Sequence, residues 1–100
     1  MKLTNEQDEC YETEMGTPTL TIELSSGQRM IPYAGFRDAV FKGDSITIRF
    51  LDWIVVIMGK SLLPLWRQLQ MQDVRIIRHS LNDSMSDCSV TAIDVREADS

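Results

Sequence analysis

The fold is decided by residues 42–58, which read KGDSITIRFLDWIVVIM. The stretch begins with lysine, glycine, aspartate and serine, a combination typical of a tight hairpin turn. After the turn Ile46, Ile48 and Phe50 alternate with polar residues, which predicts a strand that is buried on one face. The following run, residues 53–58, is apolar at every position. It therefore predicts a strand whose two faces both need cover.

The residues before this hairpin also predict strands. Residues 20–24 alternate between apolar and polar side chains, and a turn rich in serine and glycine follows at 25–28. A second strand at 29–33 contains a proline, which lacks a backbone donor and therefore favours the edge of a sheet. Residues 36–42 predict a third strand, although their apolar spacing also fits a helix.

A short helix is predicted after the apolar strand. The apolar residues within 62–69 recur at the spacing of one helical face, and Ser61 is expected to cap the N-terminus. A last core strand follows at 74–79. Together these elements predict the α+β class, as a small antiparallel β-meander sheet or open roll of five or six short strands. The one short helix precedes the last core strand.

Charge and hydropathy divide the chain of 100 residues into three parts. Residues 17–79 carry eight basic and five acidic groups, and they hold most of the branched apolar residues. They are expected to form the single α+β domain. Residues 1–16 and 80–100 each carry a net charge of −4, which predicts two acidic and solvated tails. One extra strand is expected at 90–95.

Cysteine content and hydropathy restrict the class of protein. The longest unbroken apolar run has six residues, whereas a membrane span needs about 20. No apolar signal-peptide core follows the N-terminus. The sequence therefore predicts a cytoplasmic protein that does not enter the membrane. In a reducing compartment Cys10 and Cys88 are expected to be free thiols, and without a Cys/His cluster they predict no metal site.

No motif predicts an enzyme or a cofactor. Gly59, Lys60 and Ser61 match the end of the phosphate-binding P-loop pattern, but Ile54 stands where that pattern requires a glycine. We interpret the three residues as a turn between a strand and a helix. His79 is the only histidine, and no nucleophile with a base and an orienting group can be assigned around it. The expected catalytic, cofactor-binding and metal-binding sets are therefore empty.

The best functional hypothesis is a non-catalytic binding or assembly module that acts as a homodimer, with a further protein partner left open. A body of about 60 residues without a metal or disulfide is marginal on its own. A single helix covers only one face of the apolar strand, so a second copy is expected on the other face. The alternative is a sheet that curls over its own second face. The expected self-association face consists of Trp53, Ile54, Val55, Val56, Ile57 and Met58.

The runner-up hypothesis is a small nucleic-acid-binding protein whose acidic tails moderate a basic face. Positive charge in the body of the chain is the feature that favours it. The acidic tails weigh against it, because they compete with phosphate for the same side chains. The expected basic face consists of Arg29, Arg37, Arg49, Arg75 and Arg78.

Overall fold

The computed structural model describes residues 10–79 and 89–98, which form eight strands, one α-helix and one short 3-10 helix. The α+β class expected from the sequence is confirmed. The helix α1 spans Leu63–Gln70, and the 3-10 helix spans Tyr33–Gly35. The strands are β1 (Tyr11–Thr13), β2 (Thr19–Leu24), β3 (Gly27–Pro32), β4 (Phe36–Lys42), β5 (Ser45–Phe50), β6 (Trp53–Lys60), β7 (Val74–Ile77) and β8 (Ser89–Glu97).

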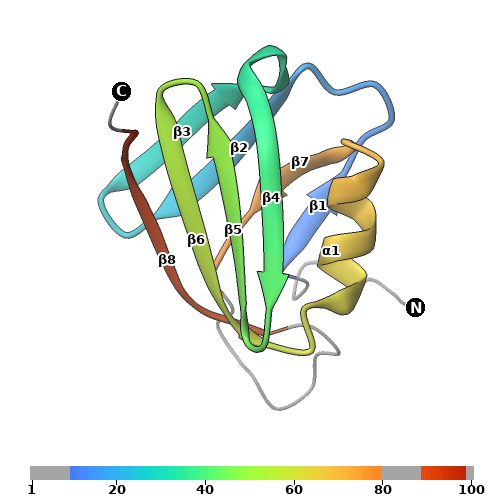
Figure 1. The fold of residues 1–100 in the computed structure, drawn as a ribbon, viewed down its shortest axis with the longest axis vertical. Coiled ribbons are helices and arrows are strands. Elements are labelled where there is room, and N and C mark those ends of the chain that lie inside the picture. The colour runs from blue at the N-terminus through green and yellow to red at the C-terminus, as the bar shows by residue number, and fades with distance from the viewer. Residues whose placement is uncertain (1–9, 80–88, 99–100) are drawn as a thin grey trace, which may run out of the picture.

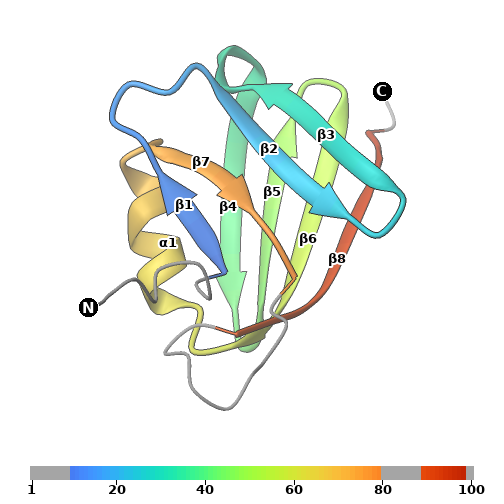
Figure 2. The same ribbon diagram turned by 180° about the vertical axis from the view of Figure 1, so that it is seen from behind.

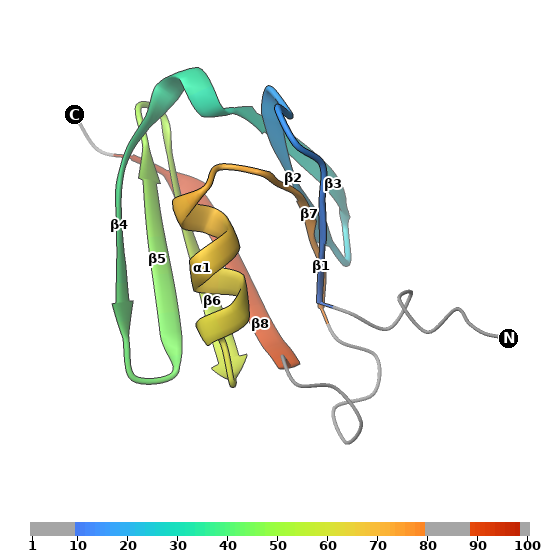
Figure 3. The same cartoon turned by 90° about the vertical axis from the view of Figure 1, so that its right-hand side faces the viewer.

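The eight strands lie in two facing sheets of four, whereas the sequence predicted five or six strands in one meander sheet or open roll. Sheet A has the order β1-β7-β2-β3, and sheet B has the order β4-β5-β6-β8. The helix α1 fills one open side between the sheets, next to β4 and β1 (Figure 3). All pairs are antiparallel except β2 with β7. That parallel pair arises because the chain crosses from β6 through α1 to reach sheet A (Figures 1 and 2).

Local sequence explains the hairpins of both sheets. A two-residue loop joins β2 to β3, where Gly27 has a φ of 143°. A second two-residue loop joins β4 to β5, where Gly43 has a φ of 62°. Both backbone conformations favour glycine because it lacks a Cβ. Pro32 lies in β3, which is an edge strand as its missing donor predicts.

The core lies between the two sheets and under α1. The inward residues of β5 and β6 are almost completely buried, as are Leu20, Ile22 and the helix residues Leu65 and Leu69. Trp66 of α1 packs against Phe41 of β4, with 5.5 Å between ring centroids. The apolar stripe predicted for the helix therefore faces the core.

The folded unit extends beyond residues 17–79 at both ends. Within the expected tail 1–16, β1 pairs with β7 and Cys10 is fully buried. Within the expected tail 80–100, the strand anticipated at 90–95 is β8, which pairs with β6 along its whole length. The correction has a common cause: both strands carry acidic residues on their outer faces, so their composition resembles that of a tail. Residues 1–9, 80–88 and 99–100 lie outside the described residues.

The ends of α1 differ from the prediction at Ser61. Leu62, and not Ser61, is the N-cap, and no side chain bonds to the first turn. Ser61 instead has a φ of 55°. At the other end, the Gln72 amide donates to the Leu69 carbonyl and the Asp73 amide donates to the Gln68 carbonyl. These two bonds define a Schellman motif, in which Gln72 takes the left-handed position that glycine usually fills.

Replacing Gln72 by glycine is expected to stabilise the fold by about 0.5–1 kcal/mol, because glycine adopts this left-handed conformation without a steric cost. Urea unfolding measures the difference. The matched control is Gln70→Gly in the last turn of α1, which is expected to cost up to about 1 kcal/mol in helix propensity. Equal destabilisation by both variants would contradict the assignment of the motif.

Candidate functional site

The outer face of sheet B carries a group of apolar side chains. The pairing register places Val40 of β4, Thr47 of β5 and Val56 of β6 in one row across the sheet. Ile54 and Met58 flank Val56 along the outer side of β6. Val40 and Met58 are 53% and 44% exposed, and Ile54 and Val56 are half-buried. Ile54, Val56 and Met58 follow one another along β6, and Val40 lies across Thr47 in the Val56 row. These four side chains are the apolar centre of a face that no described residue covers.

Charged side chains surround this apolar centre. Arg49 binds Asp38 through two hydrogen bonds, with Nε 2.6 Å from Oδ1 and Nη2 2.5 Å from Oδ2. This contact holds the pKa of the Asp38 carboxyl below its ordinary value. On the opposite flank Arg96 Nε lies 3.3 Å from Asp94 Oδ2. An apolar centre with a polar rim is the usual anatomy of a protein interface.

The predicted self-association face divides between the two sides of sheet B. Val55 and Ile57 are fully buried between the sheets, and Trp53 packs against the same core. The chain's own sheet A covers that side. Ile54, Val56 and Met58 lie on the outer side. The sequence argument left open whether the same chain or a second one covers this strand, and the structure assigns only the inner side to the same chain.

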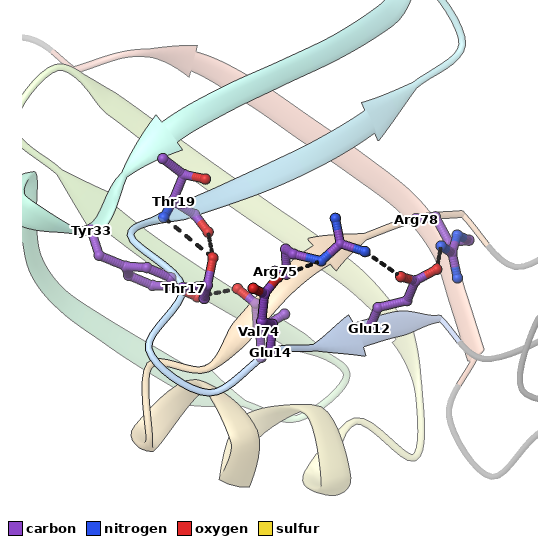
Figure 4. A network of polar contacts seen from close by, with 8 residues as sticks. All are labelled: Glu12, Glu14, Thr17, Thr19, Tyr33, Val74, Arg75 and Arg78. Carbon is purple, nitrogen blue, oxygen red and sulfur yellow. Dashed lines mark hydrogen bonds and ion pairs between the residues drawn. The ribbon is translucent and has the colours of Figure 1, made fainter.

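Two residues of the predicted basic face, Arg75 and Arg78, belong to an ion-pair network on sheet A (Figure 4). Glu12 of β1 lies between them: Arg75 Nη2 is 2.8 Å from Glu12 Oε1, and Arg78 binds the other carboxylate oxygen. Arg75 Nε is also 3.2 Å from Glu14, and Arg78 Nε is 3.6 Å from Glu23. Acidic residues of the expected N-terminal tail thus pair with these two arginines.

The remaining three arginines lie elsewhere. The Arg29 guanidinium of β3 stacks on Trp53 of β6, with its Cζ 3.9 Å from the ring centroid, and so links the two sheets. Arg49 is paired on the outer face of sheet B, and Arg37 lies on the edge strand β4. The structure therefore does not gather the five predicted arginines on one continuous surface.

Glu12 makes the fold sensitive to acid. The hydrogen bond from Arg78 is the largest cause that lowers the pKa of Glu12 from 4.5, and Arg75 adds to it. Because the folded-state pKa is lowered, this contribution is present above pH 4.5 and is lost as the pH falls through the folded value. Because Glu12 and its arginine partners are partly exposed to solvent, we expect this contribution to the free energy of unfolding to be about 1 kcal/mol.

The measurement is the difference in free energy of unfolding between wild type and Glu12→Gln as a function of pH. We expect the wild type to be more stable at neutral pH, and the difference to shrink as the pH falls below 4.5 and through the lowered pKa of Glu12. The control Glu97→Gln alters an exposed position of β8 for which the described residues supply no ion pair. A constant difference for Glu12→Gln across this range would contradict the network.

The structure also explains two sequence features that the sequence analysis rejected as sites, the P-loop-like residues and His79. Gly59 and Lys60 are the last two residues of β6, and Lys60 lies opposite Ser89 of β8. The interpretation of these two residues as a turn is therefore wrong: they belong to a sheet, and only Ser61 follows the strand. His79 Nε2 lies 2.6 Å from the Thr91 carbonyl oxygen, which ties the end of sheet A to β8.

Cys10 provides a covalent link that the sequence argument did not expect. It is disulfide-bonded, and the only other cysteine that the chain offers is Cys88, which lies outside the described residues. The prediction that Cys10 is a free thiol is therefore wrong. The sequence argument placed Cys10 in a solvated tail, whereas the structure buries it completely next to β1.

Comparisons with protein-family models, curated proteins and solved structures found no match for this chain. No helix among the described residues is long and apolar enough to cross a membrane.

Proposed function

We propose that the chain is a non-catalytic binding or assembly module that acts as a homodimer. The outer face of sheet B packs on the same face of a second copy. The observation that carries this proposal is the uncovered apolar centre of Val40, Ile54, Val56 and Met58 with its rim of ion pairs. A two-fold dimer needs a surface that complements itself, and this face supplies one.

The register of the strands favours one of the two face-to-face arrangements. An axis along β6 would bring Arg49 over Arg96 of the second copy, which is repulsive. An axis across the strands at Val56 instead brings Val56 over its own counterpart and Ile54 over Met58. It also brings Lys42 of each copy toward Asp38 of the other, an attractive contact formed twice, and brings Asp94 toward its own counterpart, a repulsive contact formed once.

The size of the face predicts a weak dimer. Stable interfaces contribute roughly 20–30 residues from each partner, whereas the outer face of sheet B offers three rows of four positions. We therefore expect a dissociation constant of about a micromolar or weaker. A dimer of this strength would assemble when the protein concentration rises and dissociate when it falls.

The substitution Met58→Asp tests the interface by placing a charge in its apolar centre. An unpaired charge buried at an interface costs about 3 kcal/mol or more, so the dissociation constant should rise roughly 100-fold. The matched control is Met30→Asp, because Met30 is 67% exposed on the outer face of sheet A. Sedimentation equilibrium should show that only Met58→Asp weakens the dimer. Equal behaviour of the two variants would overturn the assignment to sheet B.

The disulfide changes the expected compartment. We infer that the protein folds in an oxidising environment, since disulfides are rare where thiols are kept reduced. The cytoplasmic location expected from the sequence predicted two free thiols, and the disulfide contradicts that consequence. The nucleic-acid alternative is weaker than the homodimer, because the five arginines are dispersed and three of them are paired with carboxylates.

A further inference from the structure

A cleft of about 260 Å³ opens between α1 and the edge strand β4. Its floor is apolar and includes Ile48 and Leu69, which are almost fully buried. Tyr33 and Trp66 lie at its sides. The Tyr33 hydroxyl is fixed because it donates to the Val74 carbonyl at 2.6 Å, and Trp66 is held against Phe41 (Figure 4 shows the Tyr33 bond). The cleft is therefore preformed, with the size of one large side chain.

The strand beside the cleft has an unpaired edge. β4 is the first strand of sheet B and pairs only with β5. Apart from the Phe36 amide, which donates to the Tyr33 carbonyl of the preceding 3-10 helix, no backbone hydrogen bond among the described residues joins β4 to an element other than β5. An edge strand of this kind offers a row of amide and carbonyl groups to an added strand. An extended peptide that pairs with such an edge places alternate side chains on one side of the sheet.

The rim of the cleft is positively charged at one end. Arg37 lies at a register shift in β4 and lines the cleft together with Asp38. Two hydrogen bonds from Arg49 compensate the charge of Asp38. Arg37 itself makes no ion pair with any described residue, although it adds to the field that lowers the pKa of Asp38. The net charge at this end therefore favours an anionic group.

We propose that β4 and α1 form a binding site for an extended acidic peptide segment of a protein partner. The segment adds to the edge of β4, inserts one aromatic or large aliphatic side chain into the cleft, and places a carboxylate opposite Arg37. The site lies on the edge of sheet B and not on its outer face, so it does not depend on the homodimer.

The test uses a fixed set of synthetic probes, because the partner is not identified. The first probe is the blocked hexapeptide acetyl-Gly-Val-Phe-Val-Glu-Gly-amide. The second replaces its Glu by Lys, the third replaces its Phe by Ser, and the fourth carries N-methyl groups on alternate backbone amides. Alternation places Phe and Glu on the same side of an extended strand. Binding is measured from the amide shifts of β4 and α1 in NMR titrations of the full chain.

We expect the first probe to bind at β4 and each of the other three to bind at least about tenfold more weakly. Arg37→Glu should reverse the preference between the Glu and Lys probes. The matched control Arg67→Glu alters an exposed residue on the other side of α1 and should change nothing. Failure of all four probes to shift β4, or a preference for Glu that persists in Arg37→Glu, would overturn the proposal. Undiminished binding of the N-methylated probe would overturn strand addition.

Discussion

Replacing Gly59 by alanine is expected to destabilise the fold by about 3 kcal/mol or more. A Cβ on Gly59 would lie 1.8 Å from the Ser89 carbonyl oxygen and 2.9 Å from the Ser89 carbonyl carbon. These are backbone atoms, so no side-chain rotation relieves the clash. The contact occurs where the register between β6 and β8 shifts. We expect the start of β8 to separate from β6.

The matched control for this variant is Gly35→Ala. A Cβ at Gly35 would meet Leu51 at 3.7 Å, an ordinary contact distance, and Gly35 does not have a positive φ. Its stability should therefore stay within about 1 kcal/mol of wild type. Urea unfolding measures both variants, and hydrogen exchange reports protection of the β8 amides. A Gly59→Ala protein as stable as Gly35→Ala would show that β8 does not approach β6 so closely.

Loss of the disulfide is the second large effect that we expect. Cys10 and Cys88 are 78 positions apart in the sequence. A crosslink that closes a loop of this length restricts the unfolded chain, and its removal typically costs about 2–5 kcal/mol. Cys88→Ser removes the bond while leaving the buried Cys10 side chain in place. Thermal unfolding should show a lower melting temperature for this variant than for wild type.

A reducing agent provides the control for the disulfide. It should lower the stability of wild type to that of Cys88→Ser, and it should leave the variant unchanged. Mass measurement after thiol labelling reports the bond directly. Two labelled thiols per chain in native protein purified without reductant would contradict the disulfide and the inferred oxidising environment.

The elements that local sequence determines were predictable. The hairpin of β4 and β5 follows from its glycine turn and period-two pattern, and α1 follows from its apolar spacing. The parallel pairing of β2 with β7 was not predictable, because it depends on where the chain returns after α1. Without that pairing, two facing sheets could not be distinguished from one open sheet.

The candidate site was predictable only in part. The apolar run of β6 marked a strand with two faces to cover, but its pattern could not show that sheet A covers only the inner side. The sequence showed how many arginines the body of the chain carries, but not on which surfaces of the fold they lie. Glu12 resembled a tail residue because its role depends on Arg75 and Arg78, which lie more than sixty positions later.

Intermolecular contacts at Val56 test the homodimer most directly. The sample mixes isotopically labelled with unlabelled chains at a concentration above the dissociation constant. A filtered NOE spectrum of this sample reports only contacts between different copies. We predict contacts between the Val56 methyl groups of the two copies and between Ile54 and Met58. A mixed sample with no intermolecular contact at these residues, or with contacts only from sheet A, would contradict the proposed dimer.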